Sequence, residues 1–265
     1  MSREFFVFDL DNTLYPASLD VFHQIDKRMK AFIAERLKLS LEEAFVLQKT
    51  YYRKYGTTLR GLMLCHEIEP ESFLAYVHDI DHSTLPVDSR LNKALKELQG
   101  QKFIFTNGSE THAVKVLDRL GISQYFDGIF DIKMADYIPK PSPETYRRLV
   151  KKHAIKANHA VMFEDLAVNL RPASAIGMLA VWINGLGGEV HPNVSTDHID
   201  QEINDINLWL EAWNNGGMAA VKKFRHFARS PALSSLPEAL ESGSAPGPEP
   251  TRHGDWHFRG RCSDF

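Results

Sequence analysis

An unbroken apolar run that ends in two carboxylates is the feature that most limits what this chain can fold into. Four consecutive apolar residues, Phe5 to Phe8, are followed at once by Asp9 and Asp11. Such a run is typical of a strand buried on both faces, as in a parallel sheet with helices on each side. Because ligands of these sheets bind beyond the carboxyl ends of the strands, we expect Asp9 and Asp11 to lie at a site of chemistry.

Two aspartates at this spacing suit phosphate chemistry assisted by a magnesium ion. As a strand gives way to a loop, a side chain and a nearby backbone carbonyl can converge on one point, and oxygen ligands are those that Mg²⁺ prefers. A carboxylate also needs no deprotonation at neutral pH before it attacks phosphorus, while a second carboxyl can serve as acid and base. The alternative is a turn in which Asp9, Asp11 and Asn12 only satisfy backbone donors, and the pair alone does not decide between the two.

Residues 17–86 carry the spacing of helices. Apolar residues recur at helical intervals over residues 21–37, and a capping box at residues 40–43 begins a second helix that Gly56 ends. Two shorter helices follow, separated near Pro70. We therefore predict a four-helix segment that is inserted between the first strand and the rest of the sheet.

A second apolar strand ends in groups that can bind an anion. Residues 102–105 run into Thr106 and Asn107, ahead of a helix from about Glu110. A hydroxyl and exposed backbone donors at such a strand end form a cradle for an anion. An ordinary N-cap is the alternative, since Thr, Asn and Ser all cap helices.

Two later segments add a lysine and a second pair of carboxylates. Prolines on either side fix the backbone at Lys140, and a lysine held in this way can neutralise charge on a phosphate, although most lysines are only solvated. A strand over residues 160–163 ends in Glu164 and Asp165, and another strand follows over residues 179–183. This alternation of strands and helices predicts an α/β fold with a doubly wound parallel sheet and an inserted α-helical cap.

These segments, in this order, resemble the motifs of the haloacid dehalogenase-like hydrolases. The first motif of that superfamily is Asp-x-Asp-x-Thr after a hydrophobic strand, and the matching residues are Asp9, Asp11 and Thr13, followed by Thr106, Lys140 and Asp165 for the second, third and fourth motifs. The resemblance implies a Rossmann-like hydrolase core, a Mg²⁺ cofactor and hydrolysis of a small phosphorylated metabolite through an aspartyl-phosphate.

The resemblance also implies roles for individual residues. Asp9 would be the nucleophile and Asp11 the general acid and base, while Thr106, Asn107 and Lys140 would hold the transferring phosphoryl group. The implied metal ligands are Asp9, the backbone carbonyl of Asp11, and Asp165, with Glu164 as an extra ligand or a neighbour of the ligands and Asn169 as an orienting residue.

The string from Asp9 to Pro16 and two cap segments, residues 52–62 and 77–86, are similar to the pyrimidine 5′-nucleotidase branch of the superfamily. This similarity implies hydrolysis of UMP and CMP to nucleoside and phosphate. Arg53 or Arg60 could meet phosphate or ribose, and Tyr55 could stack on a base. The alternative is that the tyrosine belongs to the cap core and the arginines are solvated.

The same core motifs are compatible with other functions. A phosphatase of sugar phosphates or phosphoglycolate, a phosphomutase or a phosphotransferase would use the same motifs, and a non-catalytic protein that binds a phosphorylated ligand is a further alternative. Haloacid dehalogenases proper lack the second aspartate, which is present here as Asp11.

Composition limits the partners and the compartment. A net charge of −3 over 265 residues gives no bulk attraction to nucleic acid polymers or anionic membranes. No stretch is long enough to span a membrane, and the N-terminal apolar run is too short for a secretory signal. Cys65 and Cys262 lie far apart without metal spacing, so we expect reduced thiols in a cytoplasmic protein.

Three parts of the chain are expected from these patterns. Residues 1–16 and 87–213 would form the α/β hydrolase core, and residues 17–86 the helical cap. Residues 214–265 are poorly patterned, and the stretch 234–250 has the Ser, Pro, Gly and Glu content of a disordered tail. Nothing in these patterns decides whether the protein is a monomer or a homodimer.

Overall fold

A computed structural model describes residues 4–185, 195–222 and 225–226, with the backbone alone for the last two residues. Its sheet has the strand order β3-β2-β1-β4-β5-β6-β7. The strands are β1 (Phe5–Phe8), β2 (Gln101–Phe105), β3 (Gly128–Phe130), β4 (Ala160–Glu164), β5 (Leu179–Ile183), β6 (Gln201–Ile203) and β7 (Arg225–His226). All neighbouring strands pair in parallel except β6 and β7.

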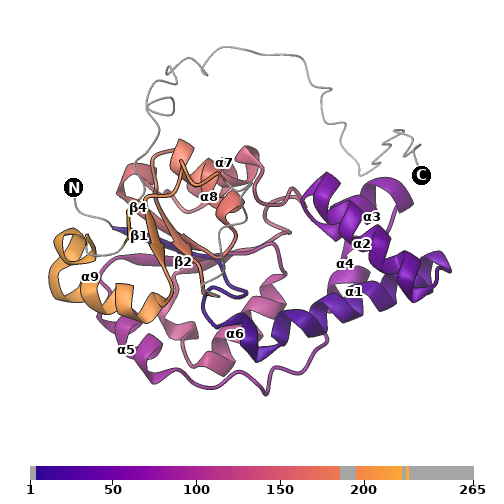
Figure 1. Cartoon of the computed structure of the whole chain (residues 1–265), viewed down its shortest axis with the longest axis horizontal. Coiled ribbons are helices and arrows are strands. Elements are labelled where there is room, and N and C mark those ends of the chain that lie inside the picture. The colour runs from indigo at the N-terminus through magenta and orange to yellow at the C-terminus, as the bar shows by residue number, and fades with distance from the viewer. Residues whose placement is uncertain (1–3, 186–194, 223–224, 227–265) are drawn as a thin grey trace, which may run out of the picture.

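Helices cover both faces of this sheet, as predicted. One face carries α5 (Ser89–Glu97), α6 (Glu110–Leu120) and α9 (Ile206–Val221), and the other carries α7 (Pro143–Lys152) and α8 (Ala167–Ala175) (Figure 1). Successive strand residues point to opposite faces, so Phe6 and Phe8 pack with the first group and Phe5 and Val7 with the second. The doubly wound α/β fold is therefore confirmed.

The central strand β1 sets the position of the site. It pairs with β2 on one side and with β4 on the other, and Phe8 lies opposite Phe163 of β4. Chain order reverses at β1, and this kind of switch point opens a crevice beyond the carboxyl ends of the strands. Asp9 and Glu164, which come next in the two strands, therefore lie side by side at that edge.

The four predicted helices of residues 17–86 are present. They are α1 (Val21–Leu37), α2 (Leu41–Tyr55), α3 (Thr58–His66) and α4 (Pro70–Val77), and they share an apolar cluster of their own. The capping box of Ser40 and Glu43 starts α2, Gly56 ends it, and Pro70 is the first residue of α4. Figure 1 shows these helices to one side of the sheet, beyond the carboxyl end of β1.

Strand β3 and helix α9 end in different ways. Strand β3 ends at Phe130, because the Asp131 carboxylate accepts hydrogen bonds from the backbone of Glu110, Lys133 and Met134 and turns the chain out of the sheet. Helix α9 continues to the buried Val221, although Gly216 and Gly217 adopt non-helical backbone angles inside it. Its first turns are anchored in the core by Trp209 and Leu210.

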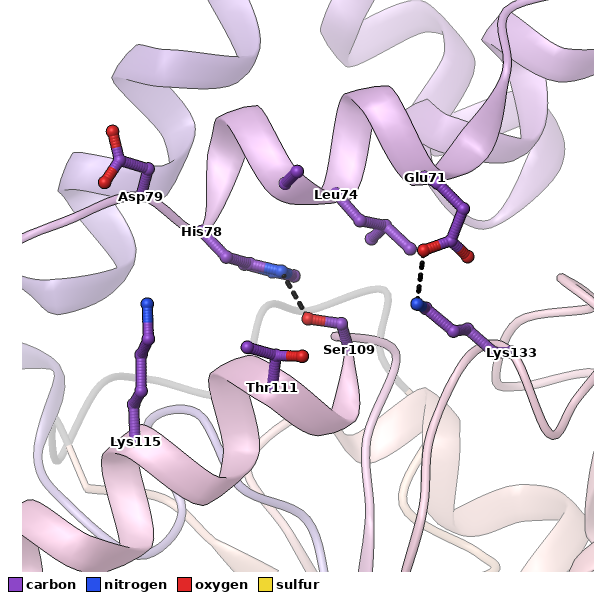
Figure 2. Close-up of a pocket in the computed structure, with 9 residues that line it drawn as sticks. Glu71, Leu74, His78, Asp79, Ser109, Thr111, Lys115 and Lys133 are labelled. Carbon is purple, nitrogen blue, oxygen red and sulfur yellow. Dashed lines mark hydrogen bonds and ion pairs between the residues drawn. The ribbon is translucent and has the colours of Figure 1, made fainter.

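A cavity of about 380 Å³ lies between cap helix α4 and core helix α6 (Figure 2). Its walls include His78 from the end of α4, and Ser109 and Lys115 from the beginning and middle of α6. An ion pair between Glu71 and Lys133 bridges cap and core at one end of it. Asp9 and Lys140 do not line this cavity, so it is separate from the polar cluster at the carboxyl end of β1.

Three expectations concern other parts of the chain. None of the described helices combines the length and the apolar character needed to cross a membrane. Cys65 lies on α3 and Cys262 lies outside the described residues, so the expectation of reduced thiols stays a prediction. Residues 227–265, the larger part of the expected disordered tail, also lie outside them.

Candidate active site

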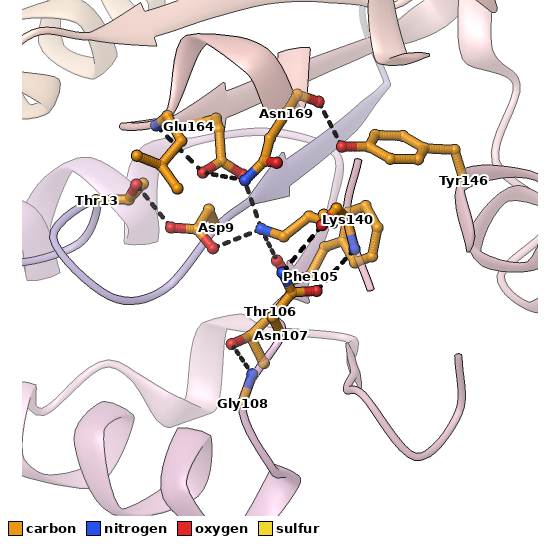
Figure 3. Close-up of polar contacts among 11 residues, drawn as sticks. Asp9, Thr13, Phe105, Thr106, Asn107, Gly108, Lys140, Tyr146, Glu164 and Asn169 are labelled. Carbon is orange, nitrogen blue, oxygen red and sulfur yellow. Dashed lines mark hydrogen bonds and ion pairs between the residues drawn. The ribbon is translucent and has the colours of Figure 1, made fainter. Parts of the chain in front are cut away.

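The ammonium group of Lys140 lies at the centre of a buried polar cluster (Figure 3). Its Nζ donates to Asp9 Oδ1 at 2.6 Å, to Glu164 Oε2 at 2.7 Å and to the carbonyl oxygen of Phe105 at 2.9 Å. Thr13 Oγ1 donates to the other oxygen of Asp9, Oδ2, at 3.0 Å. Residues from the ends of β1, β2 and β4 and from the loop before α7 thus meet at one point.

The loop that carries Lys140 is held from two sides. Asn107 accepts a hydrogen bond from the Lys140 backbone N–H at 2.8 Å and donates one to the Lys140 carbonyl at 3.4 Å. On the cap side, Gly56 at the end of α2 approaches Pro139, and a Cβ at Gly56 would lie 3.0 Å from the Pro139 Cγ. The positive φ of 84° at Gly56 also favours glycine there. Both contacts fix the lysine relative to the nucleophile.

Burial and charge act in opposite directions on this cluster. Burial and the neighbouring Glu164 raise the pKa of Asp9 to about 7, although Lys140 favours the ionised form. Burial opposes the charge of Lys140, but Asp9 and Glu164 outweigh burial and raise the pKa of the amine above its usual value. The site therefore holds a permanent cation beside a carboxylate that it helps to keep ionised.

Asp9, Glu164 and Asp165 form an acidic group in which one carboxylate oxygen of each residue lies within 4.8 Å of the others. Burial, and then Asp9 and Glu164, raise the pKa of Asp165 to about 9. Glu164 is engaged at both oxygens, since Asn169 Nδ2 donates to its Oε1 at 3.1 Å and Lys140 holds its Oε2. Clustered carboxylate oxygens that repel one another are the donor set of a hard cation, and a divalent ion would relieve this repulsion.

Thr106 directly follows strand β2 and lies near Lys140, as Figure 3 shows. Its side chain is buried, and its Oγ1 accepts the backbone N–H of Gly108 at 2.8 Å. Ser109 then caps α6 by accepting the backbone N–H of His112. The hydroxyl of Thr106 and the N-terminus of α6 therefore follow the carboxyl end of β2, where groups of these kinds can donate hydrogen bonds to an anion.

Asp11 lies in a different environment from Asp9. The Tyr15 hydroxyl donates to its Oδ1 at 2.5 Å, and His112 Nε2 lies 2.8 Å from the same atom. Burial opposes ionisation, but the charge of His112 and the hydrogen bonds from His112 and Tyr15 outweigh it and lower the pKa of Asp11 to about 2. The two aspartates of the first motif thus have pKa values pushed in opposite directions, as in sites where two carboxyls take different roles.

The structure brings together the predicted core residues but not the two predicted cap residues. Asp9, Thr106, Asn107, Lys140, Glu164 and Asp165 lie at one edge of the sheet, with Asp11 beside them. Tyr55 packs inside the cap, where its ring is 5.6 Å from that of Tyr51 and its hydroxyl 3.3 Å from Cys65 Sγ. Arg53 is exposed on α2. Base stacking by Tyr55 and phosphate binding by Arg53 stay predictions.

Three residues near the site were missed from the sequence. Tyr52, four residues before Gly56 on α2, has a pKa raised by burial and then by Asp165 and Glu164, so its phenol is near these carboxylates. Its side chain is nevertheless 47% exposed. Tyr15 and His112 hold Asp11, but His112 lies 101 residues away in the chain and carries no sequence pattern that links the two.

Comparisons with known proteins identify a family and several relatives. A family model described as haloacid dehalogenase-like hydrolase matches residues 4–177, and a second, described as a protein of unknown function (DUF1674), matches residues 226–265. Phosphate metabolism protein 8 of Saccharomyces cerevisiae is 30% identical over 195 residues, which are 67% of this chain but only 60% of the yeast protein. A glyceraldehyde 3-phosphate phosphatase of Methanocaldococcus jannaschii is 28% identical over 224 residues, 79% of this chain and 96% of the archaeal protein.

Solved structures support the fold independently. The crystal structure of a HAD phosphatase from Thermococcus onnurineus is similar with a TM-score of 0.55 at 20% identity, over 82% of this chain and 99% of that chain. The family match covers β1, the four cap helices and the strands up to β4, which are the elements that build the site. This chain therefore belongs to the haloacid dehalogenase-like hydrolase family.

Proposed function

We propose that this protein is a magnesium-dependent phosphomonoester hydrolase that forms an aspartyl-phosphate on Asp9. The observation that carries the proposal is the contact of Lys140 Nζ with both Asp9 Oδ1 and Glu164 Oε2, directly beside Asp165. An amine in this place keeps the nucleophile ionised and offsets the charge of an incoming phosphate.

Asp9 attacks the phosphorus atom, and the bond between phosphorus and the leaving oxygen breaks. Lys140 and the hydroxyl of Thr106 hold the phosphoryl oxygens, while Asn107 keeps the Lys140 backbone in place through its two hydrogen bonds. Water then attacks the phosphorus of the aspartyl-phosphate, which releases inorganic phosphate and restores Asp9.

Asp11 transfers the protons of both steps. It gives a proton to the leaving oxygen and later takes one from the attacking water. Its pKa of about 2 keeps it ionised in the free protein, which is the form that accepts a proton. A phosphate bound beside it opposes its negative charge and raises its pKa, which favours the protonated form needed for the first step.

The acidic group fits a magnesium ion. Asp9 and Asp165 would hold it, with the backbone carbonyl of Asp11 as a further ligand and Glu164 beside them. When bound, the ion would neutralise charge on the phosphoryl oxygens and on the nucleophile.

For the substrate we propose a small phosphorylated metabolite, and first a pyrimidine 5′-nucleotide such as UMP or CMP, hydrolysed in the cytoplasm. The cap residue Tyr52 supports a substrate that carries an aromatic base, because the charges of Asp165 and Glu164 act on its phenol and raise its pKa further after burial. A sugar phosphate is the second candidate, supported by the archaeal relative that is named for glyceraldehyde 3-phosphate.

Released phosphate from a panel of 5′-nucleotides and sugar phosphates, measured with Mg²⁺ and again with chelator, tests the proposal. Selective, metal-dependent hydrolysis of UMP and CMP is expected. Activity on sugar phosphates alone would support the proposed hydrolysis but reject a nucleotide as the substrate. A wild-type protein that releases phosphate from no substrate of the panel would reject the phosphatase proposal. In ¹⁸O-labelled water a hydrolase must place solvent oxygen in the phosphate, whereas a mutase or phosphotransferase would not.

The variant Asp9→Asn is the matching test of the nucleophile. An amide cannot form the acyl phosphate, so phosphate release should fall by at least about a thousandfold. The melting temperature should stay at or above that of the wild type in chelator, because a neutral group replaces a buried carboxyl whose pKa is raised to about 7. Appreciable residual turnover would refute the assignment of Asp9.

A further inference from the structure

The carboxylate of Asp11 is held at only one of its two oxygens. Tyr15 Oη, at 2.5 Å, and His112 Nε2, at 2.8 Å, both contact Oδ1. Within the described part of the chain, no side chain or backbone group hydrogen-bonds to Oδ2. One oxygen is thus fixed by the protein, and the other is left for a substrate.

The imidazole of His112 is itself held rigidly. It is fully buried on the first turn of α6, where Ser109 Oγ accepts its backbone N–H. Its ring stacks on that of His78, with centroids 4.5 Å apart and an interplanar angle of 12°. His82 Nε2 lies 3.4 Å from its Nδ1. These contacts on the face and the far edge of the ring keep Nε2 aimed at Asp11.

The supports of this ring come from the segment that returns from the cap to the core. Figure 2 shows His78 at the end of α4 pointing toward Ser109, and the His78 Nδ1 lies 2.8 Å from Ser109 Oγ. His82 follows in the same connecting segment. The orientation of Asp11 therefore depends on cap residues as well as on core residues.

Packing alone does not explain a histidine at position 112. A buried polar ring is costly unless it is hydrogen-bonded, so an apolar ring of the same shape would pack there at least as well. What the imidazole adds is the hydrogen-bond donor at Nε2, directed at the carboxylate that exchanges protons.

We propose that His112 is a positioning residue of the reaction, which together with Tyr15 holds Oδ1 of Asp11 so that Oδ2 is the atom that gives and takes the proton. This inference rests on the proposed phosphatase function. Without the donor, the carboxylate can rotate, and the proton is no longer aligned with the leaving oxygen. Because aligned proton transfer contributes about 10²–10⁴ in rate, its partial loss is measurable.

Two substrates separate this role from a structural one. p-Nitrophenyl phosphate releases a stable nitrophenolate that needs no proton, whereas glycerol phosphate releases an alkoxide that does. The value of kcat/KM covers only the steps up to phosphoryl transfer to Asp9, so it isolates protonation of the leaving group. We would measure it for the wild type, His112→Phe, which keeps a ring on His78, and His112→Gln, which keeps a donor near Nε2.

For His112→Phe we expect kcat/KM for glycerol phosphate to fall about 10- to 100-fold and that for p-nitrophenyl phosphate to change less than about threefold. His112→Gln should recover most of the loss. The control His153→Phe replaces a partly buried histidine that packs on Phe103 away from Asp11, and it should change neither value. If His112→Phe does not fold, Tyr15→Phe removes the other donor to Oδ1 and should show the same selective loss.

Equal losses on both substrates, or no loss, would overturn the positioning role, and so would a His112→Gln variant as impaired as His112→Phe with the same melting temperature. These outcomes need an active wild type. A wild-type protein that hydrolyses neither substrate, with Mg²⁺ present, would instead reject the phosphatase proposal and this inference with it.

Discussion

Lys140 places a positive charge between Asp9 and Glu164 in the interior of the protein. Both carboxylates are buried, so removal of the amine leaves negative charge without a partner. For Lys140→Met we expect the free energy of unfolding to fall by about 3–5 kcal/mol at pH 8 in the presence of chelator. Urea denaturation of the variant measures this loss.

The control for this variant is Lys115→Met, an exposed lysine on α6, for which the change should stay within about 0.5 kcal/mol. At pH 6 the loss in Lys140→Met should be smaller, because Asp9, with its pKa raised to about 7, can take up a proton there. An unfolding free energy that matches the wild type at both pH values would contradict this charge balance.

His78 should give the stability a pH dependence. Burial, and then the charge of His112, lower its pKa from 6.5 to about 3. The unfolded chain has the ordinary value, so between about pH 3 and pH 6.5 the unfolded state binds more protons than the folded state. The contribution of His78 is therefore complete above about pH 6.5 and is lost as the pH falls through this window.

The variant His78→Gln should make this pH dependence shallower between pH 6.5 and pH 4, as measured by urea unfolding at a series of pH values. Replacement of the exposed His23 on α1 by Gln should leave the slope unchanged. The same slope in His78→Gln and wild type would show that His78 is not the titrating group. The other ionisable groups that act on it are His112, Asp11, His82 and Lys115.

At the scale of elements, the strands and their ends were predictable and the rotations of helices were not. The apolar runs before Asp9, Thr106 and Asp165 located three strands of the core, because a strand buried on both faces needs an uninterrupted apolar sequence. Capping residues located the start of α2, and its glycine the end. The end of α9 was missed, since a Gly-Gly pair resembles a helix end although α9 continues to Val221.

Contacts between distant elements account for most of what the sequence did not reveal about the site. The packing of Tyr51 and Tyr55 inside the cap sets the rotation of α2, and this rotation leaves Tyr52 where the charge of Asp165 helps to raise its pKa. The contact of His112 with Asp11 likewise arises only when α6 lies beside the loop after β1. A local sequence pattern does not indicate which distant residues come into contact.

The C-terminal end of α2 is the part of the cap whose substitution should affect the substrate. If Tyr52 stacks on a nucleobase, Tyr52→Ala should raise the KM for UMP roughly 5- to 150-fold, equivalent to about 1–3 kcal/mol of lost stacking, with little change in kcat. Steady-state kinetics with UMP and with p-nitrophenyl phosphate measures the effect.

Tyr52→Phe is the matched control, because it keeps the aromatic face and should keep KM near the wild-type value. An unchanged KM in Tyr52→Ala would remove Tyr52 from the substrate site, and equal losses for UMP and p-nitrophenyl phosphate would indicate damage to the cap as a whole.

For the whole molecule, cation binding should be linked to proton release. Burial and the neighbouring acids raise the pKa of Asp9 to about 7 and that of Asp165 to about 9, so the metal-free protein holds protons at neutral pH that a cation displaces. Calorimetric titration with Mg²⁺ in two buffers of different ionisation enthalpy should show more protons released at pH 7 than at pH 9.5. Apparent affinity should also fall as the pH drops.

The same binding should stabilise the folded protein, by about 2.7 kcal/mol at a Mg²⁺ concentration a hundred times the dissociation constant. Asp165→Asn is the control, since it removes one carboxylate of the acidic group and should reduce both the proton release and the stabilisation. Heats that are equal in the two buffers at pH 7 would contradict the linkage.

The order of strands also has a consequence for synthesis. Phe5 of β1 pairs with Gln101 of β2 and with Ala160 of β4, whereas the cap helices pack mainly with one another over residues 21–77. Chains leave the ribosome N-terminal end first, and contacts between distant residues form slowly. The cap can therefore fold while β1, rich in phenylalanine, still lacks both neighbours, and the nascent chain is most exposed to aggregation until β4 has emerged.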